Sequence, residues 1–67
     1  MTLTPRQLAV LRLVAEGQTN VQIARALNLA HSTAEKHVLE LCRRSGAHNR
    51  VHAVHLAWQQ GLLGEAS

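Results

Sequence analysis

The chain has 67 residues, which is enough for one small domain but too few for two lobes that enclose a catalytic cleft. Seven Lys and Arg residues outweigh four Asp and Glu residues, and this excess favours an anionic partner such as nucleic acid or a membrane surface. The single cysteine excludes an intramolecular disulfide, and the lack of a long apolar run or a signal-like opening segment predicts a cytoplasmic protein that does not enter a membrane.

The first predicted helix covers residues 5–16. Thr4 precedes it as the N-cap, Pro5 takes the first helical position, and Gln7 completes a capping box. Gly17 ends the helix, because glycine readily adopts the left-handed backbone found just after a helix. Apolar residues recur between these signals at helical spacing: Val10, Leu11 and Val14.

The second predicted helix covers residues 20–27. Thr19 is its N-cap, with Gln22 at the capping-box position. Asn28 follows the helix and tolerates the left-handed backbone that a tight turn requires. The inward-facing residues are at helical spacing: Ile23, Ala24 and Leu27.

The third predicted helix covers residues 31–45 and has a weaker start. Ala30 stands at the N-cap position, and alanine has no side-chain acceptor. Ser32 and Glu35 offer a substitute capping box, which favours a late or frayed start, and Gly46 ends the helix. Its inward stripe follows the same spacing: Ala34, Val38 and Leu41.

The fourth predicted helix covers residues 50–60, with Asn49 as N-cap and Gly61 as the stop. Apolar residues surround this helix, more than one face of so small a domain can bury. We therefore expect a two-fold dimer through residues of this helix: Val51, Ala53, Val54, Ala57 and Trp58. The alternative is that the large apolar residues of the helix pack beneath Leu62 and Leu63.

The second and third helices are separated by a very short turn, in which Leu29 fills the corner. This arrangement is typical of a helix-turn-helix, which inserts its second helix into the DNA major groove. The sequence shows no strand pattern and no repeat, so we predict an all-α four-helix bundle in which residues 1–67 form a single domain. An ordinary αα-hairpin in a small bundle is the alternative.

A set of motifs occurs in order along nearly the whole chain. Its members are Leu3–Arg6, Val10–Gly17, Asn20, Ile23–Ala24, Leu27, Thr33, His37, Gly46, Asn49–Arg50 and Ala53–Val54. This set resembles the LuxR-type, or GerE-like, helix-turn-helix domain of bacterial transcription regulators. The resemblance implies a third helix that recognises double-stranded DNA and a fourth helix that forms a dimer. RNA polymerase is a further candidate partner of such a regulator.

Four residues on the outer face of the third helix are the candidates for reading base edges: Ser32, Glu35, Lys36 and Leu39. Lys36 can donate to guanine, Glu35 can accept from the cytosine amine, and Leu39 can contact a thymine methyl group. The resemblance implies lysine at position 35, so Glu35 replaces a positive charge by a negative one. The alternative is a solvated helix face on which Leu39 is exposed by chance.

A second set of residues is suited to contacts with phosphates, which fix register and affinity without selecting a sequence. These residues are Asn20, Thr33, Arg43, Arg44 and Arg50. For Arg43 and Arg44 the alternative is a solvated helix end whose charge is favoured by the helix dipole.

The histidines do not form a recognisable metal site. His48, His52 and His55 lie close in sequence, but Cys42 is one helix away and no carboxylate is adjacent. No nucleophile lies beside a base, and no glycine-rich phosphate loop is present. We therefore expect no metal, no cofactor and no enzymatic activity.

Two other functions remain open at this point. One is the promoter-reading fourth region of a sigma factor, which shares the helix-turn-helix pattern. The other is a protein-interaction module that keeps the helix-turn-helix as a scaffold, with Glu35 as the sign of lost DNA contact.

Overall fold

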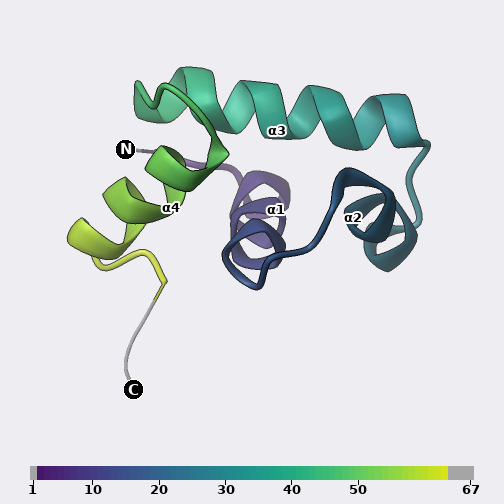
Figure 1. Cartoon of the computed structure of the whole chain (residues 1–67), viewed down its shortest axis with the longest axis horizontal. Helices are drawn as coiled ribbons and strands as arrows, with labels where there is room; N and C mark the ends of the chain where they lie inside the picture. Colours follow the sequence, from purple (N-terminus) through teal and green to yellow (C-terminus); the bar gives the residue numbers. More distant parts are fainter. Residues whose placement is uncertain (1, 64–67) are drawn as a thin grey trace.

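The computed structural model describes residues 2–63, which form four helices and no strand (Figure 1). The helices are α1 (Pro5–Ala15), α2 (Asn20–Leu27), α3 (His31–Ser45) and α4 (Arg50–Gln59). The all-α fold class expected from the sequence is confirmed. The helices α1 and α4 each end one residue earlier than expected.

The first two helices begin with reciprocal capping boxes. Thr4 Oγ1 accepts a hydrogen bond from the Gln7 backbone N–H at 3.1 Å, and Gln7 Oε1 accepts one from the Thr4 backbone N–H at 3.0 Å. Thr19 and Gln22 repeat the arrangement at 3.2 and 2.8 Å. Because each box satisfies N–H groups that have no partner within the helix, the local sequence fixes where α1 and α2 begin.

The turn between α2 and α3 depends on a left-handed residue. Asn28 has φ 57° and ψ 49°, the backbone conformation that asparagine tolerates better than most residues. The Leu29 N–H then donates to the Ala24 carbonyl at 2.8 Å. This contact closes the end of α2 and turns the chain directly into α3.

The expectation of a late or frayed start for α3 is wrong. The helix begins at His31, and Ala30 occupies the N-cap position without any side-chain hydrogen bond. The first turn is closed by the backbone alone, with the Ala34 N–H donating to the Ala30 carbonyl at 3.0 Å. Ala34 is completely buried, so packing holds this turn in place of a cap.

One apolar core joins the four helices. The helix α3 runs along one side of the molecule, and α1, α2 and α4 lie against its inner face (Figure 1). The buried apolar residues are Val10, Leu11, Val14, Ile23, Ala24, Ala34, Val38, Leu41, Ala53 and Ala57. The opposite face of α3 therefore remains open to solvent.

Candidate nucleic-acid interface

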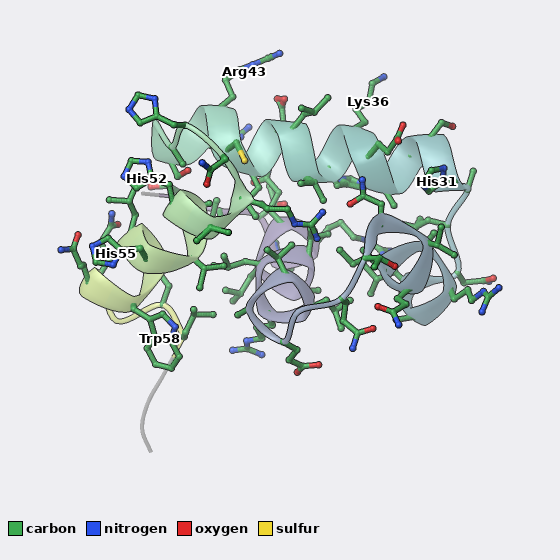
Figure 2. All side chains as sticks on the ribbon, in the orientation of Figure 1. His31, Lys36, Arg43, His52, His55 and Trp58 are labelled. Carbon is green, nitrogen blue, oxygen red and sulfur yellow. The ribbon has the colours of Figure 1, made fainter. Side chains whose placement is uncertain are left out.

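The outer face of α3 carries the four residues expected to read bases. Ser32, Glu35, Lys36 and Leu39 are all exposed, and Leu39 is 67% accessible although it is a large apolar residue. The Lys36 and Arg43 side chains extend away from the other three helices (Figure 2). The structure thus brings donors, an acceptor and an apolar group onto one open helical face.

Two weak ion pairs lie along this face. His31 Nε2 is 3.8 Å from Glu35 Oε2, and the pair is charged on both sides only when His31 is protonated. Arg43 Nη1 is 3.5 Å from Glu40 Oε1. All four side chains are substantially exposed, so each pair stabilises the helix by no more than about 1 kcal/mol.

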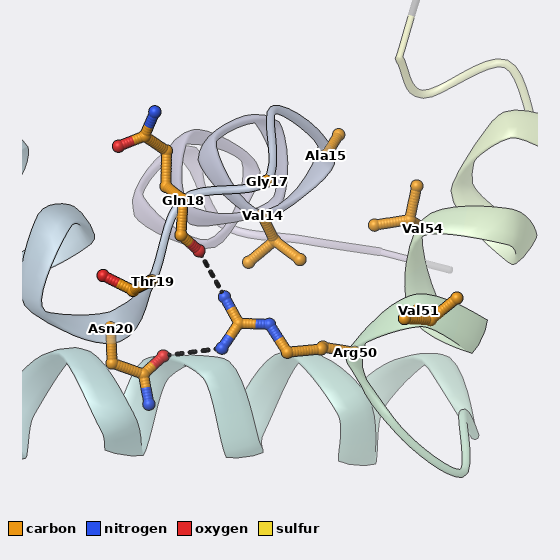
Figure 3. Close-up of a pocket in the computed structure, with 9 residues that line it drawn as sticks. All are labelled: Val14, Ala15, Gly17, Gln18, Thr19, Asn20, Arg50, Val51 and Val54. Carbon is orange, nitrogen blue, oxygen red and sulfur yellow. Dashed lines mark hydrogen bonds between the residues drawn. The ribbon is translucent and has the colours of Figure 1, made fainter.

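Two of the residues expected to contact phosphates lie against each other. Arg50 Nη1 donates to Asn20 Oδ1 at 2.9 Å, and Arg50 Nη2 donates to the Gln18 carbonyl at 2.7 Å (Figure 3). These partly buried bonds join the first turn of α4 to the first residue of α2. The guanidinium is therefore directed into the molecule. The sequence did not predict the contact between Arg50 and Gln18, because the acceptor is a backbone carbonyl and no pattern of side chains reveals it.

The remaining phosphate candidates stay on the surface. Arg43 and Arg44 are exposed in the last turn of α3, and Thr33 is half-buried in its first turn. Within residues 2–63, Arg44 and Lys36 form no ion pair, whereas Arg43 pairs with Glu40. Arg44 and Lys36 thus present positive charge that no described carboxylate neutralises.

The Arg50 contact borders an open hollow of about 500 Å³ between α4 and the carboxyl end of α1 (Figure 3). Val14 and Ala15 form its α1 side, and Val51 and Val54 form its α4 side. The hydrogen bonds of Arg50 therefore lie next to the part of α4 that was expected to form the dimer.

The predicted dimer surface on α4 is partly wrong. Ala53 and Ala57 are fully buried, because the rotation of α4 turns them toward the protein's own core. Val51 and Trp58, by contrast, are 75% and 56% exposed, and Val54 is half-buried between them. The open apolar strip of α4 therefore consists of Val51, Val54 and Trp58, and we call it the α4 strip.

The histidines at the start of α4 contact each other. The rings of His48 and His52 stack with centroids 5.2 Å apart, and the His48 backbone N–H donates to His52 Nδ1 at 3.0 Å. His55 is exposed further along α4. In the part of the chain that the structure describes, no three His, Cys, Asp or Glu residues converge as metal ligands would.

Cys42 is half-buried on α3 and packs against the core. Burial raises the pKa of the Cys42 thiol, while the positive charge of Arg50 acts in the opposite direction. The thiol is therefore neutral near pH 7 and serves as a small apolar group.

The fold and the open face of α3 define a helix-turn-helix module of the DNA-binding class. A family model described as "Bacterial regulatory proteins, luxR family" matches residues 1–57. The chain belongs to this family. The resemblance to this family that the sequence indicated is thereby confirmed, and the family and several relatives are described as regulatory or activator proteins.

Individual relatives agree with the family match. The chain is 42% identical to the "Glycerol metabolism activator" of Pseudomonas putida over 52 residues, which are 78% of this chain and 24% of that protein. It is 41% identical to the "Nitrate/nitrite response regulator protein NarP" of Escherichia coli (strain K12) over 58 residues, which are 87% of this chain and 27% of that protein. The chain thus spans about a quarter of the length of these relatives.

A solved structure shares the fold. The chain resembles "VqmA bound to DPO" with a TM-score of 0.87 and 27% sequence identity, over 98% of this chain and 33% of that one. Family and relatives are named as regulators, and none of these names describes an enzyme. Within residues 2–63, no helix is long and apolar enough to cross a membrane.

Proposed function

We propose that residues 1–67 act as one domain that binds double-stranded DNA by inserting α3 into the major groove. The observation that carries this proposal is the outer face of α3, where Glu35, Lys36 and Leu39 are exposed together while the opposite face forms the core. Lys36 donates to a guanine, Glu35 accepts from a cytosine amine, and Leu39 contacts a thymine methyl group. Ser32 lies one turn earlier and reaches the adjacent base edge.

Phosphate contacts flank this helix in the proposal. Arg43 and Arg44 provide charge at one end of α3, while Thr33 and Asn20 provide neutral donors at the other end and at the start of α2. Such contacts supply affinity that depends on salt and not on sequence. The neutralisation of Glu35 by His31 weakens the repulsion between the carboxylate and the backbone whenever His31 is protonated.

We also propose that the domain forms a two-fold dimer through the α4 strip. A two-fold interface is self-complementary, so an apolar strip on one copy meets the same strip on the other. No Asp, Glu, Lys or Arg occurs between residues 51 and 63, and such depletion of charge is typical of interface centres. A dimer then reads two half-sites separated by one helical turn of DNA.

The names of the relatives support a regulatory setting for this binding. Several of them are called activators or response regulators, which favours a transcription regulator over a sigma-factor promoter reader. A contact with RNA polymerase and a cytoplasmic location, where bacterial DNA is found, belong to the same proposal.

Fluorescence anisotropy tests the proposal directly. The domain is titrated into a labelled random duplex and into a duplex selected from a randomised library, each at two salt concentrations. We expect binding to both that weakens with salt, and tighter binding to the selected duplex. Absence of duplex binding at low salt contradicts the proposal and favours a protein-interaction module.

A further inference from the structure

The Arg50 side chain is held by two hydrogen bonds within the protein. Its guanidinium donates to both Asn20 Oδ1 and the Gln18 carbonyl, and the side chain is partly buried in doing so. Swinging the guanidinium outward onto a phosphate would break both of these hydrogen bonds, which are made by a charged donor and are therefore of the stronger kind in proteins. The cost of breaking them opposes any gain from the phosphate.

The first of these bonds fixes the orientation of the Asn20 amide. Because Oδ1 accepts from the guanidinium, the Nδ2 end of the amide is directed away from Arg50 (Figure 3). Among residues 2–63, no acceptor binds this NH₂ group, so it is free to donate outward. Asn20 is the first residue of α2, the helix that supports α3 in the helix-turn-helix.

The contact also joins distant parts of the chain. Arg50 is the first residue of α4, and its bonds cross 30 and 32 residues of sequence to reach Asn20 at the start of α2 and Gln18 just before it. The adjacent Val51 belongs to the α4 strip. Arg50 therefore sets the position of α2 relative to the helix that forms the proposed dimer.

We propose that Arg50 is a positioning residue, which orients the Asn20 amide toward a DNA phosphate and does not contact the phosphate itself. This inference rests on the proposed function, because it presupposes that the start of α2 lies against the DNA backbone. The guanidinium fork is essential to it: a lysine keeps the charge but offers a single point donor, which cannot hold both oxygens in the same planar geometry.

The test compares Arg50→Lys, Arg50→Gln, Asn20→Ala and the Arg50→Gln/Asn20→Ala double variant on a duplex with one half-site, over a range of salt concentrations. Arg12→Gln is the matched control, since Arg12 is an exposed arginine on α1 beside Trp58 and its side chain makes no hydrogen bond among the described residues. Thermal unfolding and NMR spectra establish that each variant is folded before its affinity is interpreted.

We expect Arg50→Lys, Arg50→Gln and Asn20→Ala to weaken binding by a similar factor of about 3 to 10, as loss of one hydrogen bond does. The double variant should be no weaker than either single one, because both changes remove the same contact. The dependence of log affinity on log salt concentration should become no less steep in Arg50→Gln than in Arg12→Gln. The Asn20 side-chain amide resonances should shift in both Arg50 variants before DNA is added.

The opposite pattern overturns the inference. If Arg50 touches a phosphate, Arg50→Lys retains most of the affinity, and Arg50→Gln lowers the salt slope by about 0.9 relative to the control. The double variant is then additive. If Arg50→Gln unfolds, the comparison of Arg50→Lys with Asn20→Ala still separates the two patterns. If the wild-type domain binds no DNA, the proposed function is refuted. If the wild-type domain binds DNA but the variants follow the opposite pattern, only the inference about Arg50 fails.

Discussion

Glu35 is the residue whose charge bears most on recognition. It is exposed on the proposed DNA face, and among residues 2–63 its only ion-pair partner is His31, whose Nε2 lies 3.8 Å from Glu35 Oε2, a distance that leaves the carboxylate free to turn. A carboxylate at a groove is repelled by the phosphates but accepts from a cytosine amine. Its net effect is therefore weaker general affinity and stronger sequence preference.

Replacing Glu35 by Lys should invert both effects. We expect tighter binding to a random duplex, because the change adds two units of positive charge near the backbone. Discrimination at one base pair should fall by about 1–3 kcal/mol. Anisotropy titrations at two salt concentrations measure both quantities. Glu16→Lys, an equal change of charge at the exposed end of α1, is the control. No change in either quantity would place Glu35 outside the interface.

Arg43 and Arg44 are neighbours with different surroundings. Arg43 is 3.5 Å from Glu40, whereas Arg44 has no ion-pair partner among residues 2–63. We expect Arg44→Ala to weaken binding to all duplexes alike and to flatten the salt slope by about 0.9, the value for one lost phosphate contact. Arg43→Ala should act in the same direction but less strongly, because it also frees Glu40. A changed sequence preference in either variant would reassign that residue to base reading.

At the scale of single elements, α3 lacks the cap that the other helices possess. Thr4, Thr19 and Asn49 each accept a backbone N–H at the start of their helices, but Ala30 accepts none. Ala30 already has φ −67° and ψ 150°, the extended conformation that a capping residue adopts. The backbone is thus ready for a side-chain acceptor that the sequence does not provide.

Replacing Ala30 by Ser should therefore stabilise the domain by about 1 kcal/mol, because the serine hydroxyl can accept an N–H in the first turn of α3. Chemical denaturation gives the free energy of unfolding. The control is Ala26→Ser within α2, an exposed site where serine has only a lower helix propensity and should slightly destabilise the fold. Equal results at the two sites would show that the first turn of α3 gains nothing from a cap.

At the scale of the whole molecule, the rotation of α4 separates the core from the interface. Ala53 and Ala57 face α1 and α3, while Val51 and Val54 of the α4 strip border the hollow beside α1. A substitution on α4 thus tests either folding or assembly, depending on the face that it alters.

Trp58→Glu should give a folded monomer that binds paired half-sites much more weakly but a single half-site almost normally. Ala57→Glu should instead unfold the domain, because it places an unpaired charge at a completely buried site. Sedimentation reports assembly, and circular dichroism reports folding. Gln59→Glu, at an exposed position of the same helix, should alter neither. A wild-type domain that stays monomeric at high concentration and on DNA would refute the dimer.

Features that depend on neighbouring residues could be predicted from the sequence. Capping boxes, left-handed turn residues and the spacing of apolar side chains involve contacts within a few positions, so they located the helices and the open face of α3. Whether Ser32, Glu35, Lys36 and Leu39 read bases remains a prediction.

Features that depend on how the helices pack could not be predicted from the sequence. The apolar residues of α4 surround the helix, so their spacing alone could not select the buried face, and packing against α1 and α3 turned Ala53 and Ala57 inward. Packing also let α3 begin without a cap. The Arg50 contact joins residues 30 and 32 positions apart, one of them through a backbone carbonyl. Such a bond forms because the assembled helices bring its atoms together, and local sequence does not encode that proximity.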